Sequence, residues 1–264
     1  MKNRTNEFLM EENKTIQSIL KEGYQLEFIN YIKSGFGLYK ASFFSYITFT
    51  LLAMMANEQV LRIPKFGGFL FFLLAPLQFG YFIFAEKVYK KQESNFKYFF
   101  DGYQRIVPIA LLYFTNIAIF TFILILVLMP IANSQDIQDI KNFVIANPNL
   151  LNETKFPELP VISMKTRIVF FVMMMTFLYT AILLSLASYL LWFQQMPVIK
   201  SLVYSVLIVK KKFSRWILFA SVLLMLNVLG LMAFGIGILI TMPVSLLAFY
   251  VAYENVVGSE TSFT

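Results

Sequence analysis

Apolar residues occur in long runs along the chain, and shorter polar segments separate these runs. The longest run, residues 216–253, has no charged side chain. A helix of about 20 apolar residues spans a bilayer core, so a single straight helix over this run would be almost twice too long. Gly235, Gly237 and Pro243 weaken the helical conformation within it. We therefore predict a tight hairpin of two membrane helices, 216–234 and 238–255.

Earlier apolar runs of similar length predict further spans, so the fold class is an all-α integral membrane protein. The membrane domain, residues 36–255, is expected to have six transmembrane helices, over 36–57, 66–86, 106–131, 168–194, 216–234 and 238–255. Residues 1–35 are expected to form a cytoplasmic amphipathic segment. Residues 132–167 are expected to form an external loop, and 256–264 a cytoplasmic tail.

One pattern occurs three times: an amphipathic stretch meets basic residues and then enters a pair of apolar runs. The copies begin at Phe28, Phe96 and Ser201. This pattern predicts three units, each an interfacial amphipathic helix, which we call an elbow, followed by a membrane hairpin. The external loop then lengthens the middle unit. A true triplication and a pattern imposed by shared physical constraints both remain open.

The external loop contains one predicted helix. Ser134 is a candidate N-cap, and the apolar residues Ile137, Ile140 and Val144 recur at helical spacing until Asn147.

Charge predicts the orientation of the spans. The net charge is +7, and with six spans sixteen of the 22 Lys and Arg lie on the side of the amino terminus. The positive-inside rule then places both termini in the cytoplasm, so we expect a multi-pass protein of the cytoplasmic membrane. In a soluble protein this charge would suggest a nucleic acid partner, but here the basic residues flank membrane helices, so we predict no nucleic acid and name anionic phospholipid as a candidate ligand. The residues expected to face lipid headgroups are Lys87, Lys90, Lys91, Lys210, Lys211, Lys212 and Arg215.

Candidate chemistry is sparse. The chain has no cysteine and no histidine, which excludes thiol catalysis, disulfides and histidine-based metal sites, and no cofactor is predicted. Two acidic clusters, Glu86 with Glu93 and Asp101, and Asp136 with Asp139, are better interpreted as solvated helix faces than as a catalytic pair.

Neutral polar residues inside the predicted spans are the candidates for a site. Gln78, Asn116, Asn227 and Ser185 either form hydrogen bonds between packed helices or line a polar intramembrane site. Pro76, with Gly80 after it, is expected to kink the second span, and Gly235, Gly237 and Pro243 are expected to form the last turn.

Two motifs carry a resemblance. Residues 235–258 contain Gly235, Gly237 and Pro243 followed by Tyr250-Val-Ala-Tyr253, and residues 75–105 contain Pro76-Leu-Gln-Phe-Gly80-Tyr before a polar segment. The chain resembles uncharacterised bacterial multi-pass membrane proteins similar to the membrane domain attached to some glycerophosphodiester phosphodiesterases, here without the enzyme domain. The resemblance implies a membrane domain and no particular activity.

Three functions are compatible with these observations. The leading hypothesis is a non-enzymatic subunit or accessory factor that binds another membrane protein. The second is a transporter or lipid-handling protein with a neutral polar site between helices, around Gln78, Asn116 and Asn227. The third is an enzyme that uses the cytoplasmic acidic cluster.

Overall fold

The computed structural model describes residues 16–62, 67–147, 160–233 and 235–258. It is 84% helical, and the described residues include no strand, which confirms the all-α prediction. Four helical segments are long and apolar enough to cross a membrane, or five if one bent pair of helices counts as a single span. The protein therefore has the features of a multi-pass membrane protein.

The chain forms two compact units. The first unit combines the residues up to Phe114 with those from Ile182 onward, and the second is Thr115–Ala181. Each unit is described by itself.

The first unit begins with a helical turn over residues 16–22, then α2 (Phe28–Ala41) and α3 (Phe43–Leu61). Helices α2 and α3 are bent by 92° at Ser42, where the backbone leaves the helical region. The break lies inside the expected span 36–57. The sequence did not predict it, because the apolar pattern continues across Ser42 and contains no proline there. Helix α4 (Gly67–Tyr89) follows and includes Pro76.

The amphipathic stretch that begins at Phe96 forms the 3-10 helix η1 (Phe96–Arg105). We keep the name elbow for the helices formed by the three amphipathic stretches. The Asn95 cap of η1 accepts a hydrogen bond from the backbone N–H of Lys97 at 3.0 Å. The ring of Phe99 on η1 stacks between Phe49 of α3 and Phe84 of α4, with both centroid distances 4.1 Å. Packing of aromatic rings therefore attaches η1 to the first hairpin.

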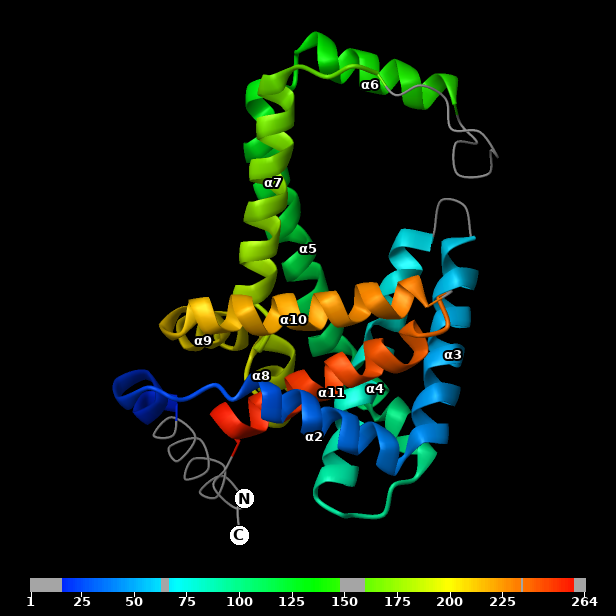
Figure 1. Cartoon of the computed structure of the whole chain (residues 1–264), viewed down its shortest axis with the longest axis vertical. Helices are drawn as coiled ribbons and strands as arrows, with labels where there is room; N and C mark the ends of the chain where they lie inside the picture. Colours follow the sequence, from blue (N-terminus) through cyan, green and yellow to red (C-terminus); the bar gives the residue numbers. More distant parts are fainter. Residues whose placement is uncertain (1–15, 63–66, 148–159, 234, 259–264) are drawn as a thin grey trace. The chain divides into compact units, whose positions relative to one another are not determined.

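The remainder of the first unit contains α8 (Ala187–Phe193), the third elbow α9 (Val198–Lys211), α10 (Phe213–Met232) and α11 (Ile238–Val256). Helix α9 ends at Lys211, and the φ and ψ of the next residue, Lys212, are −131° and 40°, close to the −138° and 42° of Ser42. Both α2 and α9 have 14 residues before this break. In Figure 1 α2 runs beside α11, and these two helices form the most extensive helix pair in the unit.

A turn separates the last two apolar helices at the glycines where the sequence predicted it. Helix α10 ends at Met232 and α11 begins at Ile238, with Gly235 at a φ of +74°, a conformation that glycine adopts without strain. Gly237 lies so close to the backbone of Gly230 that a Cβ atom on it would be 2.6 Å from the Gly230 carbonyl oxygen. Both glycines are therefore required by the geometry of this turn.

The second unit contains most of α5 (Ile106–Leu128), then η2 (Met129–Ile131), α6 (Gln135–Ala146) and most of α7 (Met164–Leu183). Figure 1 shows α5 and α7 side by side with α6 at their far end, and the rings of Phe120 and Phe177 are 4.2 Å apart. Helix α6 confirms the helix predicted in the external loop, with Ser134 at its N-cap position and Asn147 at its C-cap. The Ser134 hydroxyl makes no capping hydrogen bond, however.

Asp136, on α6, connects this helix to the start of α7. Its carboxylate accepts hydrogen bonds from the hydroxyls of Ser163 and Thr166 and from the backbone N–H of Ser163. These bonds stabilise the charged form and lower the pKa of Asp136. Asp139 accepts a hydrogen bond from Gln135 instead, so these two carboxylates have different partners.

Candidate functional site

The three elbow helices each place a small residue against the backbone of another helix. A Cβ atom on Gly35 of α2 would be 3.1 Å from the Val244 carbonyl oxygen on α11, and one on Gly102 of η1 would be 2.6 Å from the Pro76 carbonyl oxygen on α4. The Ser205 hydroxyl on α9 donates to the Leu183 carbonyl at 2.7 Å. We call the contacted elements, α4, residues 182–193 and α11, the return segments.

Ser205 also explains why the helix is broken between α7 and α8. Its oxygen accepts a hydrogen bond from the backbone N–H of Leu186 at 3.1 Å while its hydroxyl donates to Leu183. Ser205 is fully buried, so it provides polar partners for a backbone break that is shielded from water. The sequence predicted one continuous span over 168–194 because this partner lies on a different helix.

The carbonyl groups next to the elbows give one alignment of the return segments, although the Cβ position of Gly35 is closer to the Ala248 nitrogen, at 2.8 Å, than to the Val244 carbonyl. Leu183 stands 107 residues after Pro76, and Val244 stands 168 residues after Pro76. The same two spacings relate Gln78 to Ser185 and to Leu246. All three of these residues line one cavity, so corresponding positions of the return segments face a common space.

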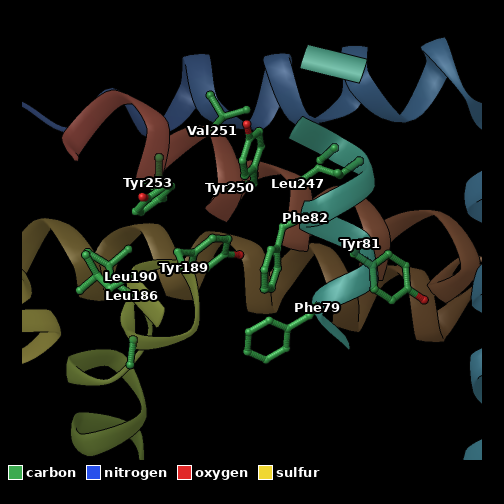
Figure 2. Close-up of a cluster of buried hydrophobic side chains, with 14 of the residues drawn as sticks. Phe79, Tyr81, Phe82, Leu186, Tyr189, Leu190, Leu247, Tyr250, Val251 and Tyr253 are labelled. Atoms are coloured by element: carbon green, nitrogen blue, oxygen red, sulfur yellow. The ribbon is translucent and has the colours of Figure 1, made fainter. Parts of the chain in front are cut away.

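The cavity has a volume of about 160 Å³. Three return segments and the first part of α5 form its wall, through Gln78, Phe79, Phe82, Tyr113, Ser185, Ser188, Tyr189, Leu246 and Phe249. The rings of Phe82 and Tyr189 lie 4.6 Å apart, and Figure 2 shows them facing each other between α4 and α8. None of the lining residues is charged.

Two polar groups of the cavity can form further hydrogen bonds with a ligand. The Tyr113 hydroxyl donates to Oε1 of Gln78 at 2.6 Å, which fixes the amide and leaves its NH₂ group as a donor. The Ser185 hydroxyl is buried without a hydrogen-bond partner among the described residues. Gln78 itself is exposed, so a molecule outside the helices can reach its amide.

The structure thus brings together two of the four predicted polar residues. Asn227 does not line the cavity; its amide donates to the Leu223 carbonyl and to the Ser245 hydroxyl, both at 2.8 Å, which joins α10 to α11. Asn116 belongs to the second unit, and its buried amide oxygen has no hydrogen-bond partner among the residues that the structure describes. Tyr113 and the aromatic walls were missed, because their roles depend on contacts between distant segments.

The basic residues have more than one role. Lys90 pairs with Glu86 at 2.6 Å, and Lys87 donates to Gln92 at 3.3 Å. Lys211 donates to the carbonyls of Ile19 and Leu20, at the end of the helical turn 16–22, so it holds the amino-terminal segment to α9. Lys91, Lys210, Lys212 and Arg215 have exposed side chains.

Pro243, which was expected in the last turn, lies instead inside α11, and a residue of another helix compensates for it. Pro243 has no N–H, so the carbonyl of Leu239 one turn earlier loses its normal helical donor. The Tyr39 hydroxyl, from the elbow α2, donates to that carbonyl at 3.3 Å. On α4, Gly80 lies against η1: a Cβ atom there would be 2.2 Å from the Phe99 carbonyl oxygen.

In the part of the chain that the structure describes, no three acidic, Cys or His residues lie close enough together to bind a metal ion. No protein family, curated protein or solved structure matched the chain. The resemblance to membrane domains attached to phosphodiesterases therefore stays a prediction.

Proposed function

We propose that this protein is a lipid-handling or transporting membrane protein that binds an uncharged membrane-dissolved molecule in the cavity between its return segments. The supporting observation is the convergence of Gln78 and Ser185, at corresponding positions of two return segments, on one uncharged cavity. Unpaired polar groups inside a membrane protein are costly, and they are commonly found where they serve a ligand. Of the three hypotheses from the sequence, this arrangement favours the second.

The proposed architecture has six spans, α3, α4, α5, α7 with α8, α10 and α11, arranged as three elbow-plus-hairpin units with both termini in the cytoplasm of a bacterium. Each elbow contacts the return segment of another hairpin, α2 on α11, η1 on α4 and α9 on residues 182–193. In membrane proteins with internal repeats the binding site commonly lies where the repeats meet. The cavity lies at such a place. Exposed basic residues on the elbows would bind anionic phospholipid headgroups.

Retention of small molecules tests this function. The full chain is purified from its membranes in mild detergent, and bound molecules are extracted and identified by mass spectrometry. We expect the wild type to retain an uncharged molecule that a Gln78→Leu, Ser185→Ala double variant loses. A matched control, Gln59→Leu with Ser34→Ala, changes exposed residues away from the cavity and should retain it. Equal retention by both double variants would contradict the proposal.

A second candidate function, an accessory subunit that binds another membrane protein, is supported by the second unit. Val144 and Ile145 on α6 are 58% and 67% exposed, although α6 lies outside the predicted spans. Exposed apolar residues outside the bilayer core are typical of a surface that a partner covers. Co-purification at native expression from wild type and from a Val144→Asp, Ile145→Asp variant tests this function, since only the wild type should retain the partner. A wild type that purifies without any partner argues against it.

A further inference from the structure

We propose that the cavity binds the carbonyl-bearing polar end of an uncharged lipid, while the apolar tail of that lipid remains among the surrounding chains. This inference rests on the proposed function and specifies its ligand. Two kinds of membrane molecule carry this chemistry: isoprenoid quinones and diacylglycerols.

The hydrogen-bonding groups of the cavity determine the polarity of the ligand. Because Oε1 of Gln78 already accepts from Tyr113, the amide presents its NH₂ group, and Ser185 presents a hydroxyl without a partner. Both groups can donate a hydrogen bond, so one acceptor such as a carbonyl oxygen can bind to both, and the Ser185 hydroxyl can in addition accept. An anionic headgroup is disfavoured, since no cation lines the cavity and an unpaired charge would be costly there.

Size and shape narrow the ligand further. A volume of about 160 Å³ is close to the roughly 150 Å³ of an apolar cavity that binds benzene. The cavity therefore holds one ring or one ester-sized group and not a whole lipid. The aromatic side chains of Phe79, Phe82, Tyr189 and Phe249 offer flat surfaces to such a group.

The depth of Gln78 in the proposed bilayer also argues against an ordinary phospholipid as the ligand. Gln78 is the central residue of α4 (Gly67–Tyr89), about 17 Å along the helix from either end at 1.5 Å per residue. In the proposed spans this position is near the middle of the bilayer core. A charged headgroup stays at the interface, whereas the polar end of an uncharged lipid can reach the middle of the membrane at lower cost.

Binding to the full chain in nanodiscs tests the inference. Three probes are compared: a short-chain naphthoquinone, dioctanoylglycerol and, as the charged comparator, dioctanoyl phosphatidylglycerol. We expect one of the two uncharged probes to bind and to displace any retained native ligand, and the comparator not to bind. Gln78→Leu and Ser185→Ala should each weaken binding about threefold to tenfold, the effect of one net hydrogen bond.

The controls are Gln59→Leu and Ser34→Ala, which should bind like the wild type, and helix content by circular dichroism shows whether each variant is folded. Unchanged binding in folded Gln78→Leu and Ser185→Ala variants overturns the inference. So does preference for phosphatidylglycerol, although a lipid-handling function would then survive. If no probe binds and no molecule is retained from native membranes, the proposed function fails together with the inference.

Discussion

Tyr39 and Tyr46 show how similar residues can have different roles at the residue scale. Both are almost completely buried, and their rings stack with centroids 5.9 Å apart. The hydroxyl of Tyr39 donates to the Leu239 carbonyl that Pro243 leaves without a helical donor, whereas the hydroxyl of Tyr46 has no partner among the described residues. Only the hydroxyl of Tyr39 should therefore contribute to stability.

Tyr39→Phe should lower the free energy of unfolding by about 1–3 kcal/mol, because the Leu239 carbonyl loses its hydrogen-bond donor. The matched variant Tyr46→Phe removes an unpaired buried hydroxyl and should be neutral or slightly stabilising. Thermal unfolding in one detergent, followed by tryptophan fluorescence, compares the two variants. Equal losses of stability would mean that the Tyr39 hydrogen bond does not stabilise α11.

Asp136 gives the second unit a dependence on pH. Hydrogen bonds from Ser163 and Thr166 lower its pKa, so its contribution to stability is present above the ordinary pKa of an aspartate, about 3.9. This contribution should be lost as the pH falls through the lowered pKa of the folded state.

Hydrogen exchange at the backbone of Ser163 and Thr166 checks this expectation. Protection in the wild type should decrease below about pH 4, while an Asp136→Asn variant should have low protection already at neutral pH. An Asp139→Asn variant is the control, since Asp139 accepts its hydrogen bond from Gln135, on the same helix, and not from the start of α7. Loss of protection in that control, and not in Asp136→Asn, would contradict the assignment.

At the scale of elements, close packing of α2 on α11 depends on Gly35. A Cβ atom at this position would be 2.8 Å from the backbone nitrogen of Ala248, whereas one on Gly37 in the same helix would meet nothing within 4 Å. The structure therefore has no room for a side chain at Gly35 but has room for one at Gly37.

Substitution by alanine should have opposite effects at these glycines. Gly35→Ala forces α2 and α11 apart and should destabilise by about 1–3 kcal/mol, while Gly37→Ala should stabilise by up to about 1 kcal/mol through higher helix propensity. Thermal unfolding of both variants measures the difference. If Gly35→Ala proved as stable as Gly37→Ala, α2 would not pack on α11 as closely as the structure shows.

The sequence predicts these elements where the signal is local. The run 216–253 is too long for one span and contains Gly235 and Gly237, so the turn between α10 and α11 was predictable, as was α6 between Ser134 and Asn147. The break at Ser42 was not predictable, because apolar residues flank it without glycine or proline at that point. The cavity could not be predicted as a site, since Gln78 and Ser185 are brought together only by contacts between distant helices.

At the scale of the whole molecule, α4 determines the number of spans. Among the described residues, four segments are long and apolar enough to cross a membrane: Phe96–Ile131, Met164–Phe193, Phe213–Met232 and Ile238–Val256. The bent pair of helices that contains α3 is a fifth candidate. Six spans require that α4, with Pro76 and Gln78 at its centre, also crosses the bilayer. In that arrangement Arg62, before α4, and Glu93, after it, lie on opposite sides of the membrane.

The absence of cysteine from the chain makes this prediction directly testable. Single cysteines at Arg62, Glu93, Gln138 and Ser214, all exposed, are labelled in intact cells with a maleimide that does not cross membranes. With six spans and both termini in the cytoplasm, cysteines at Arg62 and Gln138 should label from outside, and those at Glu93 and Ser214 only after permeabilisation. Labelling of Arg62 and Glu93 from the same side would exclude α4 as a span. The mid-membrane position of Gln78 would then be lost, and the case for an uncharged lipid would rest on the uncharged lining of the cavity alone.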